Sequence, residues 1–475
     1  MAGIFRAGQY ELQEAKIVSA DGTEVDLTLS ILSLTLFEDI YKFTMSGLVV
    51  VQDSVNLASM LPLIGQEYFI LKIATASLTQ DEHVLDFSKN AFSVNKVSGR
   101  IDIGSGVQGY QISFVSRELM VDQRTKVIKS LVGSPSDMVT NIYQNDLGTK
   151  KKLFIEPSTG IRKIVSPNKR PFELIKELMG DASSKDFFDP YYLNFETARG
   201  FNFRSLASMY AQPSVIEYRT FVTGTKTNKG AVDIETEFSN VHEYNIVSTQ
   251  DTLESNRFGA YASVLYTHDV VSKTFQKHTY NYLDSFSKER HIESTNAKFN
   301  DEDVEDYPIV SSSEITDARD RISDFPARTF VQPTSGTGTD HNHQNEFGQE
   351  DYSSNDPVNK VQRRNSQIEQ LKRGYTVQLK VHGATFISAG DIVDINLPYT
   401  ASTKTEKNED FDKIYRGKFL VSKIRHDFNP IMKSHTMRIE GVKDSLTFEL
   451  PSAYNPEMVD DTESEVENDL YATLV

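Results

Sequence analysis

Apolar and polar residues alternate with a period of two through most of the segment 1–117. This period, together with many β-branched and aromatic residues, predicts strands and little helix. The clearest strands are predicted in VDLTLSILSLTLFEDI (25–40), MSGLVVVQDS (45–54), QEYFILKIATA (66–76) and VQGYQISFVS (107–116). In the first of them, one face would carry Val25, Leu27, Leu29 and Ile31. The segment is therefore predicted to form a β-barrel or a β-sandwich domain, and we take the barrel as the prediction for 1–117.

The period changes near residue 118, where helices are expected. They are predicted in DQRTKVIKSLV (122–132), SPSDMVTNIYQNDL (134–147) and NKRPFELIKELMG (168–180). The last pattern is the strongest, because Pro171 lies in the first turn, an apolar stripe follows, and Gly180 ends it. Two short strands around a turn at 198–200 and a helix from Ser205 complete a predicted α+β domain, 118–234.

The second half of the chain returns to alternation, with one polar interruption. Strands are predicted in EYNIVSTQDT (243–252), FGAYASVLYTHD (258–269), TFQKHTYNYL (274–283), YTVQLKVHG (375–383), DIVDINLP (391–398), GKFLVSKIRHDF (417–428) and HTMRIEGVK (435–443), and a short helix in RNSQIEQLKRG (364–374). The polar stretch 330–360 predicts a mobile loop. The predicted domains are a second, discontinuous barrel (235–262 and 371–450), an inserted β/loop domain (263–370) and an acidic C-terminal tail (451–475).

Two distant stretches have nearly the same sequence, AFSVNKVSGRI and KFLVSKIRHDF. Phe92 aligns with Phe419 and Lys96 with Lys423, while upstream a glycine starts an alternating strand in each copy. The repeat-equivalent positions are Gly65, Phe92, Lys96, Gly390, Phe419 and Lys423. Chance is one explanation, because Val, Ile and Phe are favoured on any pleated face. The alternative is a duplicated β-barrel, with one copy at each end of the chain.

A duplicated barrel has a consequence for assembly. Three chains in a cyclic ring would present six similar barrels, a pseudo-sixfold ring with true threefold symmetry. Such a ring can bind a hexameric tube on one side and a trimeric body on the other. The two repeat-equivalent lysines are candidates to face acidic groups on neighbouring barrels, or else they are solvated.

The composition narrows the class of protein. The 475 residues include no cysteine and no tryptophan, which excludes disulfides and thiolate metal sites. A formal net charge of −17 argues against a protein that binds phosphate backbones. It suits a surface past which nucleic acid slides without binding, or else it serves only solubility. No apolar run is long enough for a membrane helix and no signal peptide is apparent, so we expect synthesis in a cytoplasm without membrane insertion.

Three motifs suggest chemistry, and none is convincing. GSGVQG (104–109) has the spacing of a dinucleotide-binding loop, but a strand follows it instead of a helix, which favours a hairpin turn. DHNHQNE (340–346) offers two histidines and two acids without a rigid element to hold a metal. The acids of NDEDVEDYP (300–308) are typical of a solvated face. We therefore predict no catalytic, cofactor-binding or metal-binding residues.

One segment, YYLNFETARGFNFRSLASM (191–209), combines an aromatic strand, a small turn and a Gly-Phe-x-Phe-x-Ser-Leu sequence. The residues that fill this pattern are Tyr191, Phe195, Gly200, Phe201, Phe203, Ser205 and Leu206. With NKRPFELIKELM before it and SAGDIVDINLP and GKFLVSKIRHDF after it, the chain resembles the central baseplate hub protein of contractile-tailed bacteriophages of the T-even type, over about residues 8–450.

This resemblance implies a structural virion protein with two tube-protein-like barrels per chain. It implies a homotrimer in the tail baseplate, assembled in the host cytoplasm, that joins the tail tube or a tube-initiator protein to the central spike. Inner baseplate (wedge) proteins would be further partners, and DNA would pass through the bore without specific binding. The resemblance carries no catalytic residue over. A tail-associated cell-wall hydrolase and a receptor- or glycan-binding tail protein remain the alternatives.

Overall fold

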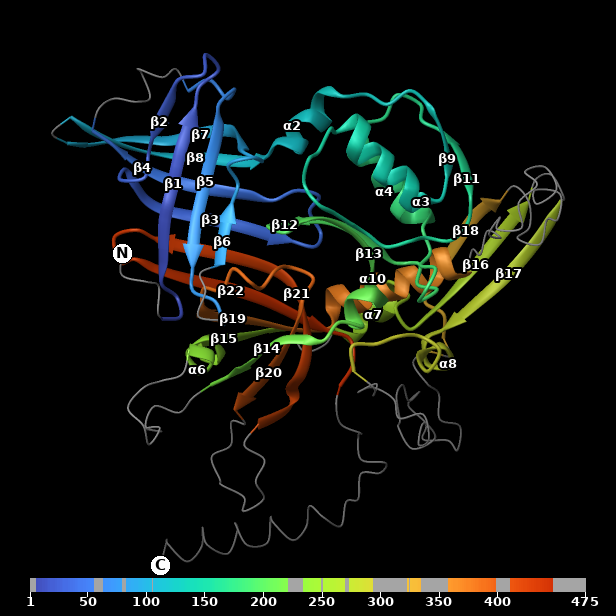
Figure 1. The fold of residues 1–475 in the computed structure, drawn as a ribbon. Coiled ribbons are helices and arrows are strands. Elements are labelled where there is room, and N and C mark those ends of the chain that lie inside the picture. The colour runs from blue at the N-terminus through green and yellow to red at the C-terminus, as the bar shows by residue number, and fades with distance from the viewer. Residues whose placement is uncertain are drawn as a thin grey trace, which may run out of the picture.

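The computed structural model is a mainly β protein with an α+β insert and two β-barrels per chain, as the sequence predicts (Figure 1). One fourteen-stranded sheet supplies both barrels. The structure describes residues 6–54, 63–78, 83–104, 106–220, 234–248, 251–269, 273–293, 323, 325–334, 358–398 and 411–446. The predicted loops 300–308 and 340–346 and the acidic tail 451–475 lie outside these residues, as does most of the polar stretch 330–360.

The first barrel is built from the first eight strands, drawn in blue to cyan in Figure 1. They are β1 (Tyr10–Val18), β2 (Glu24–Asp26), β3 (Ile31–Asp39), β4 (Ser46–Asp53), β5 (Tyr68–Thr75), β6 (His83–Asp86), β7 (Phe92–Gly104) and β8 (Val107–Ser116). Their order is β3-β4-β8-β7-β5-β1-β2, with β6 beside β5. Phe69, Leu71 and Ile73 of β5 are fully buried in the core, which follows from the period of two in their sequence.

The second barrel combines strands from two distant parts of the chain. They are β14 (Ser214–Arg219), β15 (Val241–Ser248), β19 (Tyr375–His382), β20 (Ile392–Pro398), β21 (Phe411–Asn429) and β22 (Ser434–Lys443), in the order β15-β19-β22-β21-β20-β14. Helix α6 (Ile234–Ser239) packs on this barrel through buried Phe238. The parallel strand β14 belongs to this barrel although it lies in the segment 118–234.

The α+β body lies beside the first barrel and holds its own core (Figure 1). Its elements are α2 (Arg117–Arg124), β9 (Ser130–Gly133), α3 (Pro135–Asn141), the π-helical turn η1 (Ile142–Asp146), β10 (Leu153–Ile155), β11 (Arg162–Val165), α4 (Pro171–Asp181), β12 (Tyr192–Thr197), β13 (Gly200–Ser205) and α5 (Leu206–Tyr210). Phe172, Ile175 and Leu178 form the buried stripe of α4, which confirms the helix predicted there.

A third body completes the described chain. It contains α7 (Thr252–Arg257), β16 (Ala262–Asp269), β17 (Thr274–Asn281), α8 (Tyr282–Phe286), β18 (Arg328–Thr334), η4 (Val358–Arg363) and α10 (Arg364–Arg373). Strands β17, β16 and β18 form a separate sheet, and α10 runs between this sheet and the second barrel (Figure 1). No helix in the described ranges combines the length and apolarity that crossing a membrane requires.

Two local predictions from the sequence are wrong. Residues 25–31 do not form one strand, because the Asp26 carboxylate accepts a hydrogen bond from the backbone of Thr28 and starts a turn that leaves Leu29 fully exposed. The helix predicted over 122–132 is also wrong, because α2 already ends at Arg124 and residues 130–133 pair with β11 as strand β9. The glycines of GSGVQG lie at the β7–β8 hairpin, as expected.

Candidate assembly interface

The two barrels repeat the same strand order. Strands β3-β4-β8-β7-β5 of the first correspond to β15-β19-β22-β21-β20 of the second. When Phe92 is matched with Phe419, the pairing of β7 with β8 reproduces the pairing of β21 with β22, including a one-residue bulge that follows Val94 in one and Val421 in the other. The pairings Phe69↔Phe92 and Val393↔Phe419 extend the match to β5 and β20.

The outer strands β3 and β15 also correspond, which the sequences do not reveal. Ile31 and Ser33 lie opposite consecutive residues of β4, so the strand bulges between them. Val241 and Glu243 show the same bulge against β19. The five-strand order therefore recurs with two of its bulges, and a bulge re-aims a strand in a way that random hairpins would not share.

The repeat-equivalent residues have different environments. Phe92 and Phe419 are both buried in the core of their barrel. Lys96 is exposed, whereas Lys423 forms an ion pair with Glu440 of its own barrel, Nζ to Oε1 2.7 Å. Gly65 and Gly390 both have positive φ, but the strand pairings offset them by one residue. A Cβ on Gly390 would meet the ring of Phe195, so this glycine allows close packing, whereas the space around Gly65 is open.

The barrels join edge to edge through β3 and β21. Six consecutive residue pairs form this antiparallel junction, from Lys423↔Asp39 to Phe428↔Leu34. Phe428 extends past its own barrel into the core of the first, where its ring lies 5.1 Å from that of Tyr10. The junction thus combines a continuous hydrogen-bonded sheet with a shared apolar core, so it fixes the relative orientation of the two barrels.

A polar cluster lies beside the junction, with Glu38 and Asp391 buried and Arg199 about half exposed. Glu38 of β3 accepts backbone hydrogen bonds from Ala198, in the β12–β13 turn, and from Ala389 of the second barrel, both at 2.8 Å. Arg199 in the same turn binds both carboxylate oxygens of Asp391, at 2.9 and 2.8 Å. Burial raises the pKa of Glu38 to about 7. The β12–β13 turn therefore ties the α+β body to both barrels at once.

The aromatic segment 191–209 provides this turn. Tyr191, Phe195 and Leu206 pack in a cluster with residues of the second barrel, whereas Phe201 and Phe203 belong to the core of the α+β body. Ser205 caps α5 by accepting a hydrogen bond from the Ser208 backbone at 3.2 Å, as expected for a helix that begins there. The segment is thus a two-sided core element, and no catalytic arrangement is found in it.

Gly200 offers a direct test of this packing. Its φ is +142°, and a Cβ there would clash with the backbone carbonyl oxygen of Lys152. We expect Gly200→Ala to lower the free energy of unfolding by about 2 kcal/mol, because both strain and a moved strand contribute. Urea denaturation followed by circular dichroism measures this. Gly22→Ala is the matched control, since its φ is also positive but nothing lies near it, and an equal loss in both variants would contradict the argument.

Lys151 connects α2 to β12 within the α+β body through two buried ion pairs. Its Nζ lies 2.7 Å from Glu118 and 2.6 Å from Glu196, and all three side chains are nearly inaccessible to water. Glu196 also accepts a hydrogen bond from the backbone of Met45 in the first barrel, at 2.9 Å. Burial raises the pKa of Glu196. Sequence reasoning missed this triad, since its members are far apart in the chain.

Two buried histidines lie at the barrel junction. His426 of β21 and His435 of β22 are hydrogen-bonded, Nδ1 to Nε2 3.1 Å. His435 stacks on Phe428 with ring centroids 4.0 Å apart. Burial lowers the pKa of His426 to about 4 and that of His435 well below its usual value. Both rings are therefore neutral at physiological pH.

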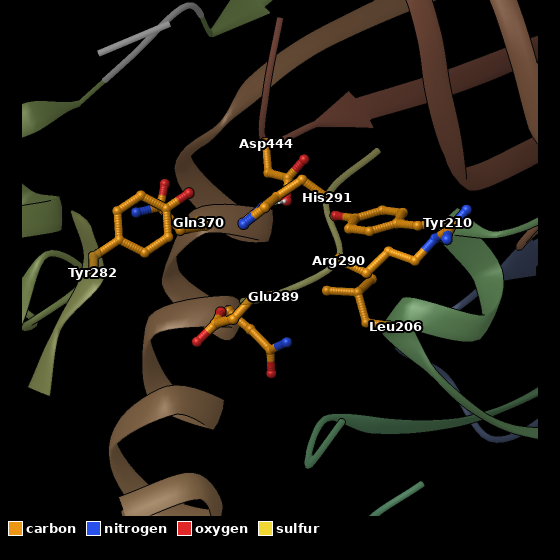
Figure 2. Close-up of a pocket in the computed structure, with 9 residues that line it drawn as sticks. Leu206, Tyr210, Tyr282, Glu289, Arg290, His291, Gln370 and Asp444 are labelled. Atoms are coloured by element: carbon orange, nitrogen blue, oxygen red, sulfur yellow. Dashed lines mark hydrogen bonds and ion pairs between the residues drawn. The ribbon is translucent and has the colours of Figure 1, made fainter. Parts of the chain in front are cut away.

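A small cavity between α5, α10 and the chain around His291 is the other polar site (Figure 2). His291 Nδ1 lies 2.8 Å from Asp444 Oδ2. Among the described residues, the buried Tyr210 hydroxyl and His291 Nε2 have no hydrogen-bond partner. The space open to the centre of a water molecule is about 10 Å³, which suits roughly one water. Its lining residues are Leu206, Tyr210, Tyr282, Glu289, Arg290, His291, Gln367, Gln370 and Asp444.

This cavity does not have the features of an active site. The His–Asp pair resembles part of a hydrolytic triad, but the lining contains no Ser, Thr or Cys that could act as the nucleophile. The volume also excludes a sugar or a peptide. Within the described ranges, no three histidine or acidic side chains are close enough to hold a metal ion.

Solved structures provide the comparison with known proteins. The 43 kDa tail protein of prophage MuSo2 from Shewanella oneidensis is 9% identical, with a TM-score of 0.51, over 91% of this chain and 98% of that protein. A tail protein from Neisseria meningitidis is 10% identical, with a TM-score of 0.49, over 92% and 97% of the two chains. No protein-family model matches the sequence, and no curated protein matches it.

The likeness to the MuSo2 tail protein shows that the chain has the fold of a phage tail protein over almost its whole length. The narrower resemblance to hub proteins of the T-even type stays a prediction.

Proposed function

We propose that this protein is a structural component of a phage-type tail, a hub adaptor whose trimer forms a pseudo-hexameric ring. The observation that carries the proposal is the pair of barrels with matching strand order and matching bulges, joined edge to edge within one chain. Three chains provide six such barrels. The ring joins the hexameric tail tube, or a tube initiator, to the trimeric central spike.

The charge and the rigid junction fit this role. Each chain carries a formal charge of −17, so a ring repels the DNA that moves through its bore and does not retain it. The β3–β21 junction and the turn with Arg199 fix two barrels as one body, which a connector under load requires. Inner baseplate proteins contact the outside of the ring, and the assembled tail of the virion, built in the host cytoplasm, is its location.

We propose no enzymatic role. The polar cavity near His291 holds roughly one water, which leaves no room for a sugar or a peptide, and its lining has no Ser, Thr or Cys. A zymogram on peptidoglycan should therefore show no clearing. Clearing that is lost when His291 is changed to Ala would favour the alternative, a cell-wall hydrolase.

Mass in solution tests the adaptor role. Light scattering should give a species of three times the chain mass of 53.6 kDa, and electron-microscopy class averages should show six similar lobes around a channel. A stable dimer, or a ring with three lobes, would contradict the proposal, because neither presents a sixfold face to a tube.

A further inference from the structure

Several strand edges have no strand partner in the described part of a single chain, and two of them belong to the strands that correspond between the two barrels. One is the edge of β7 that follows its short contact with β5, and the other is the outer edge of β15. The counterpart of the free β7 edge is the part of the β21 edge that follows the contact of β21 with β20. The counterpart of the outer edge of β15 is the outer edge of β3. Those two counterparts pair with each other within the chain. The unpaired edges are thus equivalent to the two halves of an existing interface.

The unpaired edges carry exposed apolar side chains. Ile101 and Ile103 of β7 are 64% and 57% exposed, and Tyr244 and Ile246 of β15 are 39% and 41% exposed. Tyr244 and Ile246 take the positions of Leu34 and Leu36 in β3 by strand pairing. Both of those leucines are buried at the intrachain junction. An exposed apolar strand edge is a template for pairing with another chain.

The irregularities of the two edges also match each other. Strand β7 contains one extra residue between Ser98 and Ile101, and β15 contains one between Ile246 and Ser248. The intrachain partners β21 and β3 have no extra residue at these levels. An extra residue in only one strand would slip the register and turn the side chains to the wrong face. When each of two paired strands has one extra residue at the same place along the pair, the register on either side stays unchanged.

We propose that β7 of one copy pairs antiparallel with β15 of the next copy, with Ser98 opposite Ser248 and Ile101 opposite Asn245. The occupant of both edges is a second copy of this chain. The contact is head to tail, so it repeats from copy to copy until the ring closes. This inference rests on the proposed ring and adds the strands and the register that build it.

Engineered disulfides test the register, since the chain has no cysteine. Residues directly opposite in an antiparallel pair have Cα atoms about 4.5–5.5 Å apart, within the range of a disulfide. Ser98→Cys with Ser248→Cys, and Ile101→Cys with Asn245→Cys, should give covalent dimers and trimers on a non-reducing gel. The same four substitutions recombined, Ser98→Cys with Asn245→Cys and Ile101→Cys with Ser248→Cys, should not, because about 10 Å then separates the residues.

The intrachain junction supplies the positive control. Arg425 and Phe37 are directly opposite there, so Arg425→Cys with Phe37→Cys should lose its free thiols without a change in mass. Melting temperatures within a few degrees of the wild type would show that all variants fold. If light scattering finds trimers but neither matched pair cross-links between chains, or the recombined pairs do so equally well, the register is wrong while the ring stands. If the protein is monomeric or dimeric at every concentration, both proposals fail.

Discussion

Replacing Lys151 with methionine is expected to lower the free energy of unfolding by about 3–5 kcal/mol. The ammonium group is the shared partner of Glu118 and Glu196, and its removal leaves two carboxylates buried without an opposite charge. Glu196 also anchors the backbone of Met45, so the variant weakens the contact between the α+β body and the first barrel. Urea denaturation at pH 7.5, followed by circular dichroism, measures the loss.

Lys129→Met is the matched control for this prediction. Its ion pair with Asp146 has the same length, 2.7 Å, but the lysine is about a third exposed, so we expect a loss below about 1 kcal/mol. The deficit of the Lys151 variant should shrink at pH 5, because protonation removes the uncompensated charges. Equal losses for the two lysines, or a deficit that grows on acidification, would show that the buried triad does not carry the stability assigned to it.

The sequence predicted most of the barrel strands because each buries one face. The inward residues of β5 and β20, and of β7 and β21, share the same apolar spacing in two copies. The correspondence of β3 and β15 could not be predicted in this way. Leu34 and Leu36 are buried at a junction, whereas Tyr244 and Ile246 lie on an edge that is exposed in the single chain. Because β3 and β15 lie in different environments, their sequences differ although both strands contain the same bulge.

The polar parts of the interface were harder to predict than the apolar ones. Glu38, Arg199 and Asp391 come from three bodies, so no local spacing connects them. The one available signal was an acid inside the apolar run LTLFEDI, which a strand with a buried face would rarely contain without a partner. The parallel strand β14 was missed for a related reason, since its partner β20 is far away in the chain.

Acidification is expected to destabilise the barrel junction through its buried histidines. Burial holds the pKa of His426 at about 4, against about 6.5 in the unfolded chain. Between pH 6.5 and 4, His426 binds a proton in the unfolded chain but stays neutral in the folded protein. The contribution of this residue to stability is therefore complete above pH 6.5 and is lost as the pH falls towards 4. The loss from His426 alone is about 3 kcal/mol across this window, and His435 changes stability in the same direction.

Comparing variants isolates this contribution from other groups. Glu38, with a pKa raised to about 7, has the opposite effect, since its contribution is lost as the pH rises through 7. His426→Gln removes the titrating ring and keeps a group that can hydrogen-bond to His435. Its loss of unfolding free energy between pH 7.5 and 4 should be smaller than that of the wild type by up to about 3 kcal/mol. The control is His268→Gln, at an exposed site, which should leave the pH dependence of the unfolding free energy as it is in the wild type. If the His426 variant is as acid-sensitive as the wild type, the acid response does not come from this junction.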